Sequence, residues 1–209
     1  MGAFVILIIV MALLIYAFMP KYKGPKVHKG FVTHEECDHI MEVSKPRLSN
    51  STIGVNKNAD NTIRISQTAW LDYEDKIVRD VSERCASLYD KTLVECESLQ
   101  TLKYEPGGFY SPHQDVLPLK NPRRHTCIIA LNDGYMGGET NFPNLNKKFK
   151  LEKGDVLCFD TLNGMGRITD QALHGGLPIE EGEKWIANLW IHKYPYSICL
   201  LYTSDAADD

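Results

Sequence analysis

The stretch Tyr104-Glu-Pro-Gly-Gly-Phe-Tyr-Ser-Pro-His-Gln-Asp115 decides the fold, because it places a His and an Asp two positions apart in one extended segment. Side chains at i and i+2 of a strand point to the same side of the sheet. From Leu99 to His192, short apolar runs alternate with Gly, Pro and Asn, a pattern typical of successive β-strands. We therefore expect a strand-rich core that presents His113 and Asp115 together on one face.

A third candidate metal ligand, His174, lies downstream in a His-Gly-Gly sequence. Two histidines and one carboxylate leave three adjacent positions open on an octahedral metal, an arrangement typical of non-haem Fe(II) oxygenases. Because a lone His-x-Asp often arises by chance, a surface His beside a solvated Asp is the alternative interpretation. The metal site is favoured by three motifs that follow in the order such an oxygenase needs: Gly137-Gly-Glu-Thr140, Gly154-Asp155 and Gly182-Glu-Lys-Trp185.

The segment from Lys184 to His192 predicts one wall of a pocket. As a strand it places Lys184, Ile186, Asn188, Trp190 and His192 on one face. A cation, an indole and an imidazole on one face make a poor ordinary core, but they suit a pocket with a few polar groups. We assign the glycines of Gly137-Gly-Glu-Thr140 to turn geometry rather than to chemistry.

Taken together, these motifs resemble the prolyl 4-hydroxylase family over roughly residues 31–196. The resemblance implies a 2-oxoglutarate- and Fe(II)-dependent dioxygenase on a double-stranded β-helix. In that family dioxygen and 2-oxoglutarate react at the iron, the cosubstrate becomes succinate and carbon dioxide, and L-ascorbate returns oxidised iron to Fe(II). The matching motifs are Arg64-x-Ser66-x-Thr-Ala-Trp-Leu71, Leu99-Gln100, Tyr104-Glu-Pro-Gly, Tyr110, His113-x-Asp115, Gly-Gly-Glu-Thr140-x-Phe-Pro143, His174 and Gly-Glu-Lys184-Trp.

The same resemblance implies roles for single residues. His113, Asp115 and His174 are the expected iron ligands, and Lys184 completes the catalytic set. The far carboxylate of 2-oxoglutarate needs a fixed cation, and Lys184, ten residues after His174, is the candidate. Tyr104 and Thr126 are expected to donate hydroxyl hydrogen bonds to the cosubstrate; the alternative for each is a side chain that only packs.

The substrate implied by the resemblance is a proline in a peptide, which would arrive already extended as a polyproline II helix. Each candidate contact also has a plain structural alternative, such as a surface charge or a core aromatic. Two other functions stay open: the same chemistry on another amino-acid acceptor, and a non-catalytic barrel that binds metal or a proline-rich peptide. The positions similar to the family's peptide contacts are Arg64, Ser66, Glu97, Tyr110, Arg123, Trp190 and His192.

The expected fold class is α+β, with a double-stranded β-helix (jelly-roll) core and N-terminal supporting helices. One helix is predicted after the capping box Thr33-x-x-Glu36, and a second over residues 72–89, capped by Asp72 or a neighbour. The polar segment 49–61 is expected to be a loop, either a lid over the peptide or a plain surface loop. The predicted division is a membrane anchor (1–20), a basic linker (21–30), the dioxygenase domain (31–196) and a disordered tail that resembles translated adapter sequence (197–209).

The N-terminal segment is expected to form a single transmembrane helix, since residues 3–19 carry no charge. A cleaved signal peptide is the alternative. Lys21, Lys23, Lys26 and Lys29 follow the span and favour a cytoplasmic domain by the positive-inside rule. The family resemblance instead implies, for a eukaryotic protein, the endoplasmic reticulum membrane with a lumenal domain, so the side of the membrane stays open.

Charge and cysteine spacing exclude several other classes. The formal net charge of −4 gives no basic field for nucleic acid. The six cysteines contain no Cys-x-x-Cys pair, so a zinc finger is not expected. Cys85 and Cys96 could form a bridge in an oxidising compartment, and Cys127 and Cys158 are expected to be buried. The remaining histidines outside the core pattern, His28, His34, His39 and His125, are expected to bind no metal.

Overall fold

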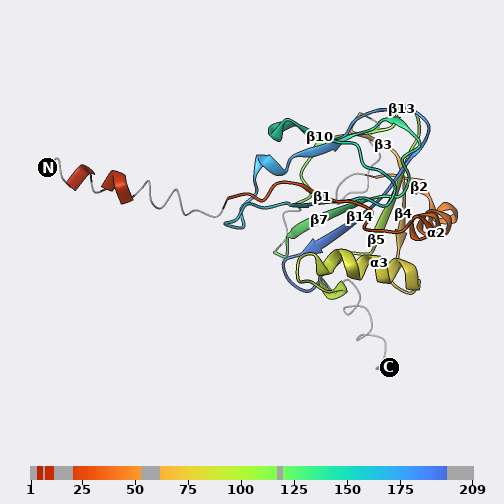
Figure 1. The fold of residues 1–209 in the computed structure, drawn as a ribbon, viewed down its shortest axis with the longest axis horizontal. Helices are drawn as coiled ribbons and strands as arrows, with labels where there is room; N and C mark the ends of the chain where they lie inside the picture. Colours follow the sequence, from red (N-terminus) through yellow and green to blue (C-terminus); the bar gives the residue numbers. More distant parts are fainter. Residues whose placement is uncertain (1–3, 7, 12–20, 53–61, 117–119, 197–209) are drawn as a thin grey trace, which may run out of the picture.

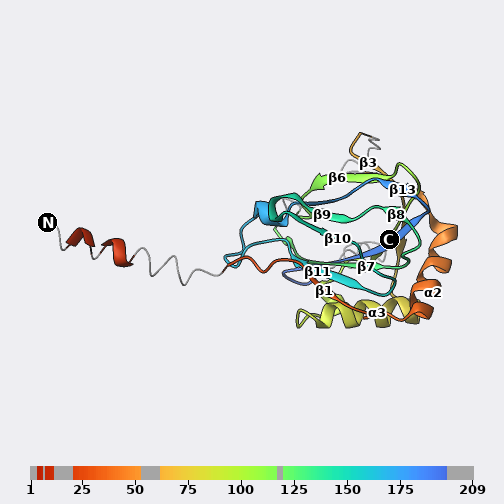
Figure 2. The same cartoon turned by 45° about the horizontal axis from the view of Figure 1, so that its top comes forward.

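The computed structural model describes residues 4–6, 8–11, 21–52, 62–116 and 120–196. Two β-sheets lie face to face, and two helices cover the outer side of the larger sheet (Figures 1 and 2). Along the chain, successive strands from Leu99 onward pass between the two sheets, which is the winding of a double-stranded β-helix. The tail predicted at 197–209 lies outside the described residues.

The larger sheet carries the longest strands of the core. All its neighbouring strands run antiparallel. It has seven strands in the spatial order β1 (Lys26–His28), β11 (Val156–Asp160), β7 (Arg123–Ala130), β14 (Lys184–His192), β5 (Leu99–Tyr104), β4 (Gln67–Leu71) and β2 (Ser49–Asn50). The edge strand β1 comes from the segment expected to be a linker.

The smaller sheet has shorter strands and faces the inner side of the larger one (Figure 2). A further two-stranded sheet joins β8 (Met136–Gly137) to β13 (Ile179–Glu181). The five strands of the smaller sheet are, in spatial order, β10 (Lys147–Phe149), β9 (Thr140–Phe142), β12 (His174–Gly176), β6 (Phe109–His113) and β3 (Arg64–Ile65).

Helix α2 (His34–Ser44) begins at the cap that the sequence indicates, whereas α3 (Lys76–Ser87) begins at Lys76, four residues later than the expected start at residue 72. Helix α2 has the complete Thr33/Glu36 capping box, and α3 begins after Asp75, whose carboxylate accepts from two backbone N–H groups. Short 3-10 helices complete the described structure at η1 (Lys45–Arg47), η2 (Leu93–Glu95), η3 (Pro143–Leu145) and η4 (Asp170–Ala172).

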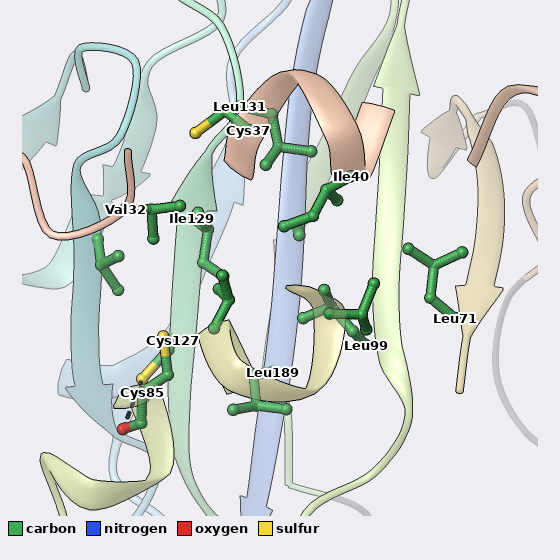
Figure 3. Packing of buried hydrophobic residues seen from close by; sticks show 14 of the residues in the cluster. Val32, Cys37, Ile40, Leu71, Cys85, Leu99, Cys127, Ile129, Leu131 and Leu189 are labelled. Carbon is green, nitrogen blue, oxygen red and sulfur yellow. Dashed lines mark hydrogen bonds between the residues drawn. The ribbon is translucent and has the colours of Figure 1, made fainter. Parts of the chain in front are cut away.

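Two apolar clusters hold these layers together. The first joins α2 and α3 to the outer side of the larger sheet, where Ile40, Cys85, Cys127 and Leu189 meet (Figure 3). The second fills the space between the sheets and includes Tyr104, Ile128, Phe142 and Phe159. Alternate residues of β7 therefore enter different clusters, as the period of a strand requires. The free cysteines include Cys85 and Cys96, so the bridge considered between them is not formed.

Two parts of the expected fold class are wrong. The domain is mostly sheet with few helices, rather than α+β, because the chain from Leu99 onward supplies strands with only single turns of 3-10 helix between them. Within the described residues, no helix is long and apolar enough to cross a bilayer, so the expected transmembrane helix is not supported.

Candidate active site

Strand pairing brings the three predicted metal ligands together. His113, the last residue of β6, is paired directly with His174, the first residue of β12. Asp115 follows β6 and lies between them: its two carboxylate oxygens are 3.5 Å from His113 Nε2 and 3.7 Å from His174 Nε2. One ligand atom from each residue lies within 4.8 Å of the others. The three ligand atoms are therefore close enough together to bind one metal ion.

The orientation of both imidazoles is fixed by backbone carbonyl groups. His113 Nδ1 lies 2.9 Å from the carbonyl oxygen of Ser111, and His174 Nδ1 lies 3.1 Å from that of Ala172. Because a carbonyl only accepts, each Nδ1 carries the proton, and each Nε2 keeps its lone pair. Both Nε2 atoms face Asp115, so two neutral nitrogens and one carboxylate point at the same place.

The close approach of β6 and β12 depends on a residue without a side chain. A Cβ at Gly175 would lie 2.7 Å from the carbonyl oxygen of Tyr110, closer than real contacts allow. At the next position, Gly176, the nearest atom would be 3.8 Å away. Gly175 therefore sets the strand spacing beside the metal ligands.

Asp115 is buried and is held by Thr126. Thr126 Oγ1 donates a 2.7 Å hydrogen bond to Asp115 Oδ2. Burial raises the pKa of Asp115, but its interactions with His174 and then His113 lower it further, so the pKa falls well below its usual range. Thr126 was expected to donate to 2-oxoglutarate; the structure gives its hydroxyl a different acceptor. Its contribution is to orient a ligand.

His174 lies in an aromatic environment. Phe142 stacks on its ring at 5.5 Å between centroids, and Phe159 meets it edge-on at 4.6 Å. Burial lowers its pKa to about 4 against the opposing effect of Asp115. The imidazole is therefore neutral near pH 7, the form that binds a metal.

Lys184 stands in the same pocket as the two histidines. It is 4% exposed, and its Nζ donates to the carbonyl oxygen of Gly138 at 2.6 Å. Among the described residues no carboxylate lies within ion-pair distance of it. Burial and nearby Lys150 lower the pKa of Lys184 to about 8, while the more distant Glu139 opposes them. A buried cation without a carboxylate partner is a site for an anion.

The pocket lined by metal ligands and Lys184 includes one residue that the sequence did not predict there. Thr140 is buried in it, although its motif was assigned to turn geometry, whereas Asn188 lies on the pocket-lining face where the alternation of its strand placed it. The position of Thr140, two residues after the glycine pair, was the available signal. The lining comprises Tyr104, Tyr110, His113, Ile128, Thr140, His174, Gly175, Gly176, Lys184, Ile186 and Asn188.

The predicted peptide contacts fall into two groups, and the first lies beside His113. Tyr110 stacks on the His113 ring at 3.7 Å between centroids, and the Arg64 guanidinium lies 4.6 Å from the Tyr110 ring centre. Arg64 Nε donates to Ser66 Oγ at 2.9 Å, while its Nη2 is buried with no partner among the described residues. These side chains make a flat surface next to the metal ligands.

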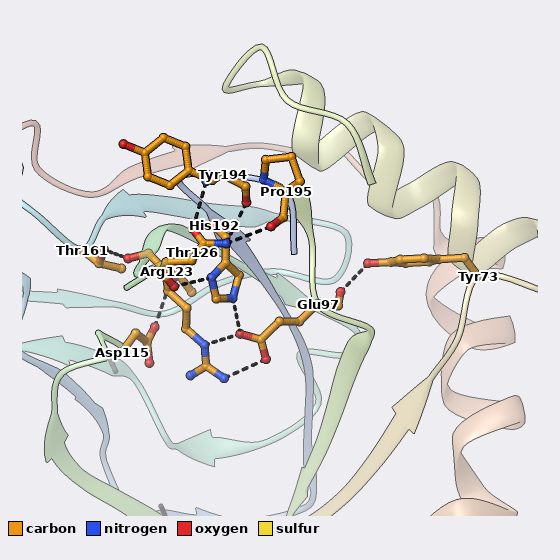
Figure 4. A network of polar contacts seen from close by, with 10 residues as sticks. Tyr73, Glu97, Asp115, Arg123, Thr126, Thr161, His192, Tyr194 and Pro195 are labelled. Carbon is orange, nitrogen blue, oxygen red and sulfur yellow. Dashed lines mark hydrogen bonds and ion pairs between the residues drawn. The ribbon is translucent and has the colours of Figure 1, made fainter. Parts of the chain in front are cut away.

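The second group is a buried network on β7 and β14 (Figure 4). The Glu97 carboxylate receives both Arg123, through Nε and Nη2, and His192 Nε2 at 2.8 Å. The Arg123 guanidinium also lies 3.7 Å from the ring centre of Trp190. Burial raises the pKa of Glu97, but the hydrogen bonds from His192 and Arg123 lower it more. The charges in this network are therefore compensated within the protein.

The donor set fits Fe(II). Two neutral imidazole nitrogens and a carboxylate oxygen are converged, each ligand is held by a hydrogen bond, and the described residues add no further His, Cys, Asp or Glu to the cluster. Such a set leaves coordination positions for a chelating cosubstrate and for dioxygen. His28, His34, His39 and His125 are not in the cluster.

Comparison with known proteins gives consistent matches. The model of the 2OG-Fe(II) oxygenase superfamily matches residues 99–192. A putative prolyl 4-hydroxylase of Acanthamoeba polyphaga mimivirus is 32% identical over 188 residues, which cover 84% of this chain and 77% of the relative. Probable prolyl 4-hydroxylase 6 of Arabidopsis thaliana is 33% identical over 195 residues, covering 79% and 68%.

A solved structure with a similar fold is the viral collagen prolyl hydroxylase of Paramecium Bursaria Chlorella virus-1 in its 2OG complex. The TM-score is 0.67 at 26% identity, and the match covers 81% of this chain and 96% of that one.

Proposed function

Since the chain belongs to the prolyl 4-hydroxylase family of 2OG-Fe(II) oxygenases, we propose that it hydroxylates a proline within an extended peptide. The observation that carries this proposal is that one pocket is lined by His113 and His174 together with Lys184. A dicarboxylate cosubstrate needs both kinds of group: a metal for its oxo-acid group and a cation for its far carboxylate. A barrel that only bound peptide would have no need of a buried lysine there.

His113, Asp115 and His174 would hold Fe(II). With 2-oxoglutarate and dioxygen bound, that iron supplies the oxidation that splits the cosubstrate into succinate and carbon dioxide and inserts oxygen into a C–H bond. The protein's own residues bind, orient and exclude water. Thr126 holds the carboxylate ligand in place, and the backbone carbonyls described above hold the imidazoles.

The far carboxylate of 2-oxoglutarate would lose its hydrating water molecules and form an ion pair with the Lys184 ammonium. One N–H group of the Lys184 ammonium already donates to the carbonyl oxygen of Gly138, so two N–H groups remain for the ligand. Thr140 and Tyr104 line the same pocket and offer hydroxyl groups to the cosubstrate. Tyr104 keeps the role expected for it, and Thr140 takes the one expected of Thr126.

For the peptide, we propose the flat surface formed by Tyr110 and Arg64 beside His113. Aromatic faces suit a proline ring, and the polyproline II conformation presents the ring without a large ordering cost. The collagen substrate named for the viral structure and the HIF peptide of the Trichoplax adhaerens complex are both proline-containing chains, which supports a peptide acceptor here.

The test supplies the full chain anaerobically with Fe(II), ascorbate and labelled 2-oxoglutarate, then admits oxygen with a proline-rich peptide or with the same peptide carrying Ala for Pro. We expect succinate release stimulated by the first peptide alone, with a mass gain of one oxygen on proline. Succinate without peptide oxidation would redirect the search to another acceptor. No succinate with either peptide would contradict the proposed activity.

A further inference from the structure

Cys127 and Cys158 face each other on the outer side of the larger sheet. They are directly paired residues of β7 and β11, and their sulfur atoms are 3.0 Å apart without a covalent bond. Directly opposite residues of antiparallel strands have Cα atoms about 4.5 or 5.5 Å apart. That range lies within the Cα separation of ordinary disulfides, about 4.4–6.8 Å. The pair can therefore be joined with little backbone movement.

A basic cavity opens onto one member of the pair. Its volume is about 590 Å³, and Cys158 lines it, whereas Cys127 is fully buried under α3 beside Cys85 (Figure 3). The cavity also has four permanent cations on its wall: Lys21, Lys23, Lys26 and Arg124. Lys26 is the direct partner of Cys158 on the edge strand β1, so both side chains project from the same face.

Among the residues that the structure describes, one carboxylate lines this cavity, and it is already compensated. Asp160 lies 2.7 Å from His125 Nδ1 and 3.5 Å from an Arg124 nitrogen. A chain with a net charge of −4 thus carries a local excess of positive charge beside Cys158, which is largely buried but contributes to the cavity wall. Such a cavity attracts an anion over a distance set by the salt concentration.

We propose that Cys127 and Cys158 form a thiol–disulfide exchange site, and that its reagent is an anionic small-molecule disulfide that enters the basic cavity. The Cys158 sulfur, as thiolate, attacks one sulfur of that disulfide, whose S–S bond breaks and releases one thiol. Cys127 then attacks the Cys158 sulfur and displaces the second thiol. The two cysteines lose two protons and two electrons in all, and these convert the external disulfide into two thiols.

The order of attack follows from the surroundings of the two sulfurs. Cys127 is hydrogen-bonded to Cys158 and packs against the carbonyl of Cys85; these contacts and its burial raise its pKa. A thiol in such a place keeps its proton and has no access to solvent. Cys158, at the cavity wall, therefore reacts first with the external disulfide, and Cys127 then forms the Cys127–Cys158 bond.

Disulfide formation would also affect the iron site, because each cysteine is adjacent in the sequence to a residue that contacts one of the metal-binding side chains. Thr126 precedes Cys127 and holds Asp115. Phe159 follows Cys158, packs on His174, and is the direct partner of Thr126. Closing the sulfur separation to about 2.05 Å draws the two strands together at this rung. This coupling rests on the proposed function, whereas the exchange itself does not.

The first test treats the reduced full chain with oxidised glutathione, blocks free thiols and maps peptides by mass. We expect a Cys127–Cys158 cross-link that lacks two hydrogens. Cys127→Ala should stop at a glutathione adduct on Cys158, Cys158→Ala should give neither product at this pair, and Cys96→Ala should behave as wild type. Absence of the cross-link in the wild-type protein, or a cross-link that uses Cys85, would overturn the exchange site.

The charge of the reagent is tested separately. Oxidised glutathione, an anion, should form the cross-link roughly fivefold faster than cystamine, a cation, at low salt, because each exposed charge pair is worth up to about 1 kcal/mol. The double variant Lys21→Glu, Lys23→Glu should remove this preference, and Lys148→Glu on β10 should retain it. Equal rates for both reagents in the wild-type chain would overturn the anionic specificity.

The coupling is measured by metal binding rather than by turnover. Mn(II), which reports occupancy through its magnetic resonance signal, should bind the cross-linked protein about tenfold or more weakly than the reduced protein, the loss typical of a disturbed ligand partner. Glutathione-treated Cys158→Ala should bind as the reduced protein does. Unchanged Mn(II) affinity after full cross-linking would overturn the coupling and leave the exchange site standing.

Discussion

Lys184 is a buried cation and Arg123 a partly buried one, both on the central strands of the larger sheet, yet their surroundings are opposite. Arg123 is held by the Glu97 carboxylate and covered by Trp190. Lys184 has a backbone carbonyl as its hydrogen-bond acceptor within the described structure, and burial lowers its pKa. The difference shows two uses of a cation: one that is paired with a carboxylate stabilises the local structure, whereas one without a carboxylate partner is available to bind an anionic ligand. Each prediction below changes one side of this comparison.

The largest effect is expected from Lys184→Met. Removing the cation should raise the KM for 2-oxoglutarate by about 100-fold or more, since loss of one partner of a buried charge pair costs about 2–5 kcal/mol. Without cosubstrate the variant should be at least as stable as wild type, because a desolvated charge has been removed. Steady-state kinetics and thermal unfolding measure the two effects.

The control for this variant is Lys150→Met, which removes a lysine that donates to the neighbouring carbonyls of Tyr135 and Gly137 but does not line the pocket. Its KM for 2-oxoglutarate should stay within about threefold of wild type, on the scale of an exposed charge. An unchanged KM in Lys184→Met would remove Lys184 from the cosubstrate site.

Glu97→Gln tests the ion pair that compensates the charge of Arg123. Arg123 and His192 would lose their shared carboxylate, and stability should fall by about 3 kcal/mol, the cost of an uncompensated buried charge. The KM for peptide should rise while that for 2-oxoglutarate stays constant. Denaturant unfolding and kinetics measure these quantities, with Glu95→Gln as the control; a variant as stable as wild type would show that the network contributes no net compensation.

Thr126→Val sharpens the comparison at the metal, since valine keeps the shape and removes the hydroxyl. Asp115 would lose its 2.7 Å donor, and Fe(II) affinity should fall by roughly 10-fold, with little change in peptide binding. Anaerobic metal titration measures it. Thr68→Val, which removes a buried hydroxyl bonded to the Thr101 carbonyl, is the control. Equal metal affinities in both variants would contradict a role for Thr126 in orienting the ligand.

The smallest effect is expected from pH. Lys184 is charged below its pKa of about 8, so kcat/KM for 2-oxoglutarate should be constant on the acid side and fall about tenfold per unit well above pH 8. Because the folded-state pKa lies below the unfolded value, the cost of burying this charge is present below pH 8 and fades as the pH rises toward about 10.4. A profile for Lys184→Met that keeps the same descending limb would assign it to another group.

The sequence could predict what depends on local spacing. His113 and Asp115 share a side because they stand two apart in a strand, and the capping box of Thr33 fixes the start of α2. Lys184 was placed in the pocket by the alternation of its own strand. In each case the deciding interaction is within a few residues or follows from strand periodicity.

The remainder depends on which strands meet, which spacing does not reveal. Thr126 could be placed on an inward face, but its bond to Asp115 follows from where the chain after β6 crosses β7. The contact between Glu97 and His192 spans 95 positions, and that of Cys127 with Cys158 needs the register of two strands. The apolar N-terminal segment was expected to form a transmembrane helix, and the described residues contain no helix long and apolar enough for one.

Gly175 has a consequence for how the protein can vary. Its missing side chain lets two strands approach until both imidazoles face one carboxylate, so the affinity for iron is encoded partly in a position that offers no donor atom. In a saturation library selected for iron retention, glycine should be the sole survivor at 175, while alanine should be tolerated at 176. A catalogue of ligands alone would overlook this constraint on the evolution of the site.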